Sequence, residues 1–167
     1  MSDYHTVFGS LASYEKGGVE IIEDDPRRYV FSNVFEVASR SLPYEKVAVG
    51  KNLDYVLEAL RAEGDSPWFS AAHDEAVLVM DGEVEVHLIK PSAPLVPDGT
   101  EGSVLLDHEP AGAPMGWIKA RRGHMALLPR GAAYQFRVSG EPGVLLLQTI
   151  RGAHTVERWR DICQTAA

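Results

Sequence analysis

The chain has 167 residues, of which 45% are hydrophobic and 24% are charged, and its formal net charge is −8. This length suits one globular domain, and the acidic balance argues against nucleic acid and anionic membranes as partners. Cys163 is the only cysteine, so we expect no internal disulfide and no thiolate metal cluster. The sequence has no leader pattern and no apolar run of the roughly 18 residues that span a bilayer, so we expect a cytoplasmic protein.

The N-terminal part of the sequence is polar. Residues 1–28 include the mixed run Glu23-Asp24-Asp25-Pro26-Arg27-Arg28, which is typical of a peripheral arm. We therefore expect an N-terminal arm over residues 1–28 and a single domain over residues 29–167. The apolar residues between 29 and 41 fit neither a helical nor a strand period, so both structures remain open for that segment.

The next two segments predict a short strand and a helix. Residues 46–49 have the composition of a strand. Asn52 can cap a helix over residues 53–60, and Gly64 would end it. The apolar stripe of that helix would consist of Leu53, Val56, Leu57 and Leu60. We expect it to pack on the domain or on a partner.

From residue 68 onward the pattern is one of short strands separated by turns. The predicted strands cover residues 76–80, 83–88, 116–120, 125–128, 134–138 and 144–150. Asp81-Gly82 predicts a hairpin, and residues 91–115 predict a long loop or an elaborated hairpin. Residues 155–163 predict a C-terminal helix capped by Thr155. Together these elements indicate an all-β antiparallel sandwich or barrel with helical additions.

The segment from Trp68 to Gly82 resembles the first motif of the cupins, which reads His-x-His, then a Glu, then a Gly. Counted back from Gly82, the Glu position falls on Glu75, and the two His positions fall on Trp68 and Ser70. The motif therefore keeps its carboxylate and its glycine and lacks both imidazoles.

The segment from Gly123 to Tyr134 resembles the second cupin motif, which reads Gly-Asp, Pro-x-Gly and a final His. Pro129 and Gly131 fall in register, and the final His position is Tyr134. The resemblance implies a cupin-type antiparallel β-barrel, a double-stranded β-helix, over residues 29–167. Three of the four usual metal ligands are absent, so we expect no metal and no catalytic residue in this chain.

Four residues of these motifs are candidates for lining a substrate path or an interface: Trp68, Tyr134, His73 and Glu75. Trp68 is expected to point into the barrel, where it could fill the space of a metal and donate its indole N–H to Glu75. Alternatively it lines a substrate path or an interface. His73, Glu75 and His124 could form a displaced metal site. Alternatively, His73 and His124 are only hydrogen-bonded near the rim of the barrel.

Several segments together resemble the small subunit of the two-subunit hydroquinone 1,2-dioxygenases, over about residues 29 to 163. They are Phe31 to Val37, Pro43 to Lys46, Gly50 to Leu53, Ala72 to Glu75, Met80 to Glu83 and Leu145 to Ile150. In that family the larger cupin subunit holds Fe(II), and the assembly cleaves hydroquinone-type rings to 4-hydroxymuconic semialdehydes. The resemblance implies a cytoplasmic heterotetramer of two small and two large chains that takes a small aromatic substrate.

Two other functions remain open on the residues alone. The chain could be a stand-alone binding or sensor barrel for a small aromatic or sugar-like ligand. It could also be a metal-independent isomerase or epimerase that uses Tyr134, His73 and Glu75 as acid and base. Co-purification with a different chain separates the subunit from both alternatives.

Overall fold

The computed structural model describes residues 10–13 and 32–162. Most of the predicted arm over residues 1–28 and the end of the predicted C-terminal helix, with Cys163, therefore lie outside the described residues. The helices and strands are α1 (Val34–Arg40), β1 (Lys46–Asn52), β2 (Tyr55–Asp65), β3 (Trp68–Ala71), β4 (Glu75–Asp81), β5 (Glu83–Pro91), β6 (Ser103–Leu106), β7 (Gly112–Arg121), β8 (Met125–Leu128), β9 (Ala133–Ile150), β10 (Thr155–Val156) and α2 (Trp159–Ile162).

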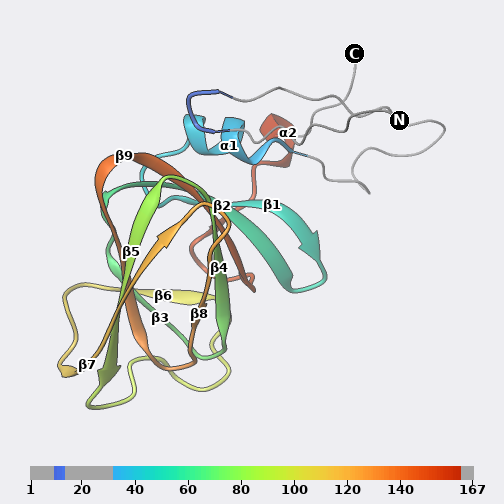
Figure 1. Ribbon diagram of the computed structural model, residues 1–167. Helices are drawn as coiled ribbons and strands as arrows, with labels where there is room; N and C mark the ends of the chain where they lie inside the picture. Colours follow the sequence, from blue (N-terminus) through green and yellow to red (C-terminus); the bar gives the residue numbers. More distant parts are fainter. Residues whose placement is uncertain (1–9, 14–31, 163–167) are drawn as a thin grey trace, which may run out of the picture.

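The strands form one curled, mostly antiparallel sheet that closes around an apolar interior (Figure 1). The strand β9 joins its two halves. Its first part pairs with β3, β5 and the end of β2, and its second part pairs with β4 and the rest of β2. The prediction of an all-β antiparallel barrel is confirmed, and each strand predicted from the sequence is present.

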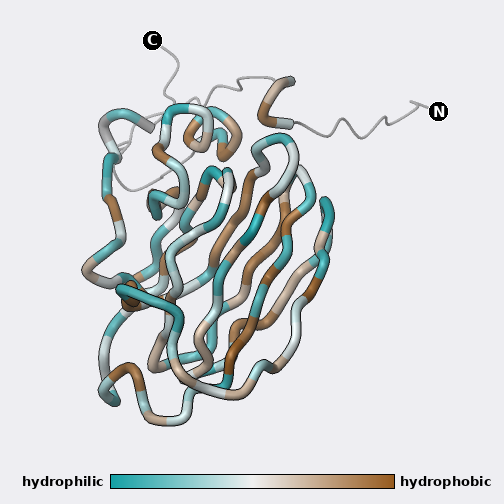
Figure 2. Tube along the Cα trace, turned by 90° about the vertical axis from the view of Figure 1, so that its left-hand side faces the viewer, coloured by the Kyte–Doolittle hydropathy of each residue, from teal (hydrophilic) through white to brown (hydrophobic). Residues whose placement is uncertain are grey.

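Hydrophobic and hydrophilic residues alternate along several strands (Figure 2), as expected where successive side chains face opposite sides of a sheet. The interior cluster contains large residues from both halves of the sheet, among them Leu60, Phe69, Tyr134, Phe136 and Leu147. A second cluster lies on the outer face of β1, β2 and β9, beneath α1 and α2, which lie side by side in Figure 1.

The segment of residues 29–41, for which the sequence allowed either a helix or a strand, contains the short helix α1. The Asn33 side chain caps it by accepting hydrogen bonds from the backbone N–H groups of Phe35 and Glu36. At the C-terminal end of the described residues, the predicted helix over residues 155–163 is mostly wrong. Thr155 belongs to β10, which pairs with the start of β1, and the described helix α2 has four residues.

The predicted helix over residues 53–60 is wrong, because these residues form a turn and the strand β2. Leu53 has a φ of +57°, outside the helical region, and it occupies the two-residue turn between β1 and β2. Within β2, the side chains of Val56, Glu58 and Leu60 are buried in alternation. The buried charge at Glu58 hid this strand period, and the apolar spacing then matched a helical stripe by coincidence.

The predicted hairpin at Asp81-Gly82 is also wrong, although the turn is present. β4 pairs with β8 and β9, whereas β5 pairs with β7 and β9, so the chain crosses from one half of the barrel to the other at Gly82. Gly82 has a φ of 83°, and a Cβ there would lie 2.9 Å from the Cα of Gly143. Residues 91–115 form the elaborated hairpin, because β5 pairs with β7 while β6 leaves to pair with β3.

Candidate functional site

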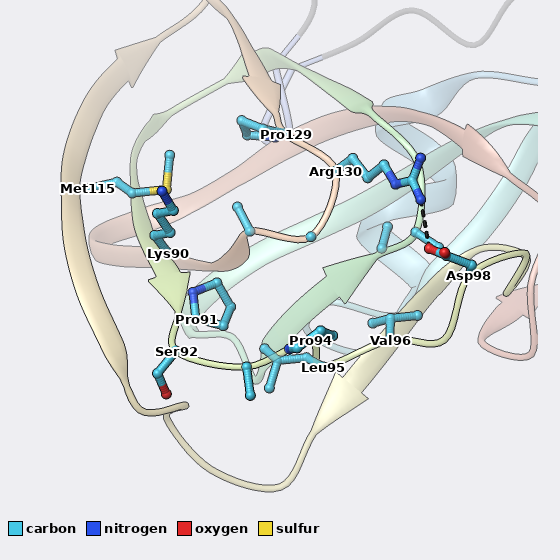
Figure 3. A pocket seen from close by; sticks show the side chains of 15 residues that line it. Lys90, Pro91, Ser92, Pro94, Leu95, Val96, Asp98, Met115, Pro129 and Arg130 are labelled. Carbon is cyan, nitrogen blue, oxygen red and sulfur yellow. Dashed lines mark hydrogen bonds and ion pairs between the residues drawn. The ribbon is translucent and has the colours of Figure 1, made fainter.

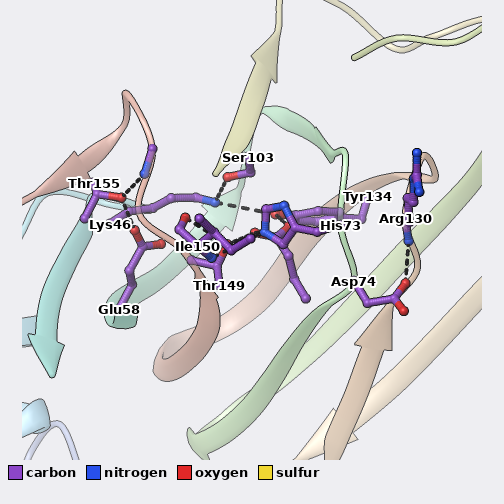
Figure 4. Close-up of polar contacts among 12 residues, drawn as sticks. Lys46, Glu58, His73, Asp74, Ser103, Arg130, Tyr134, Thr149, Ile150 and Thr155 are labelled. Atoms are coloured by element: carbon purple, nitrogen blue, oxygen red, sulfur yellow. Dashed lines mark hydrogen bonds and ion pairs between the residues drawn. The ribbon is translucent and has the colours of Figure 1, made fainter. Parts of the chain in front are cut away.

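A chain of polar side chains crosses the interior of the barrel (Figure 4). The Tyr134 hydroxyl donates to Oε2 of Glu75 at 2.6 Å, and the Thr149 hydroxyl donates to Oε1 of Glu75 at 2.6 Å. The Nζ of Lys46 donates to the Ser103 hydroxyl and, at 3.4 Å, to the Tyr134 hydroxyl. These residues come from β1, β4, β6 and β9, so the closure of the barrel brings them together.

Lys46 is 3% exposed, and its position is the least usual feature of this network. Its Nζ lies 4.4 Å from the centre of the Phe69 ring, a favourable distance for a cation over an aromatic face. Burial lowers the pKa of Lys46, while the carboxyls of Glu75 and Glu58 act in the opposite direction. A lysine this deeply buried is stable only where charged or polar groups compensate it.

Glu58 is the second acidic group near Lys46. It is 1% exposed and accepts a hydrogen bond from the Thr155 hydroxyl at 2.6 Å, while its other oxygen has no partner among the described residues. Burial raises the pKa of Glu58, and the nearby Lys46 ammonium opposes that rise. Burial and the carboxylate of Glu75 likewise raise the pKa of Tyr134, so its hydroxyl stays protonated and donates.

These residues do not fit the metal that the cupin motifs would ordinarily hold. Glu75 stands at the carboxylate position of the motif, and both of its oxygens already accept hydrogen bonds from hydroxyl groups. The nearby cation is the ammonium of Lys46, which would repel a divalent ion. Among residues 10–13 and 32–162, no three His, Cys, Asp or Glu side chains converge as metal ligands.

The position of Trp68 differs from the expectation. Trp68 is buried, but it packs with Ile89 and Ala133 in a separate cluster, whereas its neighbour Phe69 contacts Tyr134 in the interior. Successive residues of a strand face opposite sides, so a shift of one position exchanges the two faces. Phe69 therefore takes the inward place assigned to Trp68, and the groups that bind Glu75 are Tyr134 and Thr149.

The structure places His73 at the outer end of the network. Its Nε2 lies 2.9 Å from the Thr149 hydroxyl, and through Thr149 it is linked to Glu75. His124 lies elsewhere, in the turn before β8, where its Nδ1 accepts from the backbone N–H of Arg121. The displaced metal site of His73, Glu75 and His124 is therefore not assembled. Of the four predicted site residues, the fold joins Tyr134, Glu75 and His73 and leaves Trp68 apart.

Two surface hollows lie near these residues. One has a volume of about 270 Å³, and its lining includes Tyr55, Leu127 and Ile150 together with His73 and Glu75. The other, of about 550 Å³, lies between the loop after β5 and the turn before β9 (Figure 3). In the second hollow, Arg130 forms an ion pair with Asp98 at 2.6 Å. The other basic side chain of the lining is that of Lys90.

Sequence reasoning missed four members of the network: Lys46, Glu58, Ser103 and Thr149. The available signal was a charged residue inside an apolar strand segment. Lys46 precedes three consecutive buried residues, and Glu58 stands between Leu57 and Ala59 in β2. Such a residue is either exposed at an edge or buried with a partner, and only the fold distinguishes these cases.

The titration of Glu58 gives a testable pH dependence. Because its pKa is raised in the folded state, its contribution to stability is complete below the ordinary value of 4.5 and is lost as pH rises through the raised value. We expect the free energy of unfolding of Glu58→Gln to increase relative to that of the parent as pH rises above 4.5. Urea denaturation at a series of pH values measures this difference.

Glu157→Gln serves as a control, because its stability relative to the parent should change with pH in the opposite direction. The Trp159 indole N–H and Lys51 lower the pKa of Glu157, so its contribution to stability is lost as pH falls. Glu157→Gln should therefore lose stability relative to the parent as pH rises. Parallel curves for the two variants would contradict the assignment of a raised pKa to Glu58.

Comparison with known proteins gives matches among solved structures. No protein-family model matches the chain, and no curated protein matches it either. The chain is similar to hydroquinone 1,2-dioxygenase PnpCD in complex with Cd²⁺ and 4-hydroxybenzonitrile, with 56% identity over 96% of each chain and a TM-score of 0.89. It is also similar to hydroquinone 1,2-dioxygenase from Sphingomonas sp. TTNP3 with 4-hydroxybenzoate bound, with 58% identity over 99% of this chain and 100% of that chain and a TM-score of 0.92.

Each of these enzymes also contains a longer chain that shares the fold. The chain covers 39% of the longer chain of PnpCD at 14% identity and 40% of that of the Sphingomonas enzyme at 17% identity, with TM-scores of 0.58 and 0.59. The PnpCD structures contain Cd²⁺ or Fe³⁺. The prediction of a cupin-type barrel is confirmed. In the described part of the chain, the helices are too short to cross a bilayer.

Proposed function

The chain belongs to the small-subunit family of the two-subunit hydroquinone 1,2-dioxygenases, and we propose that it serves the ring-cleaving enzyme as a subunit without a metal of its own. In this proposal the larger cupin subunit holds Fe(II) and cleaves hydroquinone-type rings to 4-hydroxymuconic semialdehydes. The observation that carries the proposal is the interior ammonium of Lys46, placed beside the one carboxylate that the cupin motifs retain.

The chemistry supports this division between two chains. Ring cleavage needs a redox metal that holds the phenolate and oxygen together, and the described residues offer no group of ligands for one. We propose two small and two large chains in a cytoplasmic assembly. Trp68, Tyr134, His73 and Glu75 then act in this chain as structural or interface residues, with no direct part in bond cleavage.

The stand-alone binding barrel has less support than the subunit. A ligand at the barrel centre would have to displace side chains that already contact one another there. The rings of Phe69 and Tyr134 lie 5.7 Å apart, those of Tyr134 and Phe136 lie 5.5 Å apart, and Lys46 lies over Phe69.

Oxygen uptake with hydroquinone and Fe(II) tests the proposed function. We expect no turnover by the small chain alone, because it lacks an oxygen-activating centre, and full turnover by the mixture with the larger chain. The measurement compares the small chain, the large chain and both together. Turnover by the small chain alone, or full turnover by the large chain without it, would contradict the proposal.

Metal analysis tests the absence of a site in this chain independently. After mild dialysis, we expect the isolated chain to retain no stoichiometric transition metal, because Lys46 stands beside Glu75. Elemental analysis measures the metal content. One equivalent of iron, nickel or zinc that is retained by the parent and lost in Glu75→Ala would overturn this part of the proposal.

A further inference from the structure

One part of the barrel's outer surface is apolar and uncovered among the described residues. We call it the uncovered face. Its outward-facing residues on β2, β9, β4 and β8 are Tyr55, Leu57, Gln148, Ile150, Ala76, Leu78, Met125 and Leu127. None of the eight is charged, and Gln148 is the only one with a polar group other than the Tyr55 hydroxyl. An antiparallel sheet that faces water ordinarily carries polar residues there.

The exposed fractions show how much apolar surface this face presents. Tyr55 is 61% exposed, Leu57 40%, Met125 68% and Leu127 57%. Cross-strand register joins them into rows: Leu57 is opposite Gln148, Gln148 is opposite Ala76, and Ala76 is opposite Leu127. Contiguous apolar surface of this kind marks an interaction site more often than scattered exposed residues do.

The neighbouring part of the same sheet shows what a covered surface looks like in this fold. Ala59 of β2 and Leu146 of β9 are cross-strand partners in the next row, and both pack in the cluster that contains Val37 of α1 and Trp159 of α2. The apolar surface continues past the edge of these helices onto the uncovered face. The described part of the chain thus covers one half of this sheet surface and leaves the other half open.

A second exposed apolar group, on β7, is of a different kind. Met115, Trp117 and Ile118 are exposed, but Lys119 follows them and forms an ion pair with Glu83 at 2.7 Å. The Trp117 ring stacks on His87 of β5. Charged groups thus interrupt the β7 surface, whereas the uncovered face contains none.

The uncovered face has a hollow at the end where β4 begins. This is the hollow of about 270 Å³, and five of its lining residues belong to the uncovered face: Tyr55, Ala76, Leu127, Gln148 and Ile150. His73, Asp74, Glu75 and Thr149 complete the lining, so the hollow lies against the outer end of the interior network. Its size suits one apolar side chain of a partner, which is how central interface residues are usually anchored.

We propose that the uncovered face is the surface on which the larger subunit docks, with one of its apolar side chains seated in this hollow. The inference rests on the proposed function. The larger chains of the two related enzymes share the fold at TM-scores of 0.58 and 0.59, so they carry an equivalent outer sheet surface. Where two twisted sheets pack face to face, their apolar side chains interdigitate, and the uncovered face supplies one surface of that kind.

Cysteine labelling tests which surface the larger chain covers. In a Cys163→Ser background, Leu127→Cys places a single thiol on the uncovered face, and Trp117→Cys places one on β7 as the matched control. With a maleimide reagent, we expect the thiol at 127 to react quickly in the isolated small chain and at least about tenfold more slowly after the larger chain is added. The thiol at 117 should react at the same rate in both. Protection at 117 with none at 127 overturns the proposal.

The same labelling detects other occupants. If the thiol at 127 is already shielded in the isolated chain and becomes reactive when residues 1–31 are deleted, the N-terminal segment covers the face. If shielding depends on the concentration of the small chain alone, a second copy covers it. Either result overturns the docking of the larger chain at this face.

Affinity measurements separate a failure of the docking surface from a failure of the proposed function. With its own larger chain co-expressed, the parent should form a stable complex, and Leu57→Lys and Leu127→Lys should each weaken it by at least about 30-fold. Trp117→Lys should change the affinity by no more than about twofold. If the parent forms no complex, the proposed function fails. If the parent binds and the two variants bind equally well, only the docking surface is wrong.

Discussion

Replacing Lys46 with methionine should lower the free energy of unfolding by about 3–5 kcal/mol, the range for removing one partner of a buried charged group. The substitution keeps an apolar stem of four heavy atoms and removes the ammonium, so Glu75 and Glu58 lose the cation that lies near both. The Tyr134 hydroxyl also loses a hydrogen-bond donor. Urea denaturation, followed by tryptophan fluorescence, measures the change.

Lys51→Met is the matched control, because Lys51 lies on the same strand and forms an ion pair with Glu157 at 3.4 Å near the surface. An exposed pair of this kind contributes about 0–1 kcal/mol. Equal and small effects of the two substitutions would show that the Lys46 ammonium does not balance the interior carboxylates. A double variant, Lys46→Met with Glu75→Gln, should recover part of the loss, since it removes the charge that was left unpaired.

Replacing Trp68 with alanine should lower the free energy of unfolding by about 3–5 kcal/mol, the range for truncation of a large buried aromatic residue. Trp68 is 7% exposed and packs in one cluster with Ile89 and Ala133, against which the partly buried Leu95 and Leu106 also pack. Thermal and urea unfolding of the isolated chain measure the effect. Trp117→Ala is the control, because Trp117 is 57% exposed and its loss should cost about 1 kcal/mol or less.

The Trp68 prediction has an informative alternative outcome. If Trp68→Ala unfolds like the parent while the assembled enzyme loses affinity for its substrate, then Trp68 lines a substrate path across the interface. Unchanged stability together with unchanged activity would contradict both roles, and the satellite cluster around Ile89 would then be dispensable.

The barrel could be predicted from the sequence because its signals are local. The composition of segments such as residues 76–80 and 144–150 predicts strands, and the glycines between the segments predict turns. The pairing of those strands was not local. The turn at Gly82 looked like a hairpin, and only the assembled sheet shows that β4 and β5 separate there to pair with different parts of β9.

The site was harder to predict, because its members come from distant segments and one of them is a buried lysine, which is uncommon. Glu75 and Tyr134 could be found, since a motif with known spacing marks both. Lys46 could not, because lysines are rarely buried and neither cupin motif includes it. Trp68 was placed on the wrong face because residues 72–74 separate β3 from β4, so the alternation of faces does not continue unbroken from Glu75 back to Trp68.

The long strand β9 has a consequence for how the chain reaches its native state. Its partners β2, β3, β4 and β5 all precede it in the sequence, and β2 and β4 pair with its second part, which ends at Ile150. At an elongation rate of about 5–20 residues per second, Ile150 is added roughly 5–20 s after Tyr55. During synthesis the four earlier strands therefore lack their central pairing partner, and the unpaired backbone N–H and C=O groups at their edges are open to wrong associations. Closure of the barrel is then a late and slow event, dominated by long-range pairings.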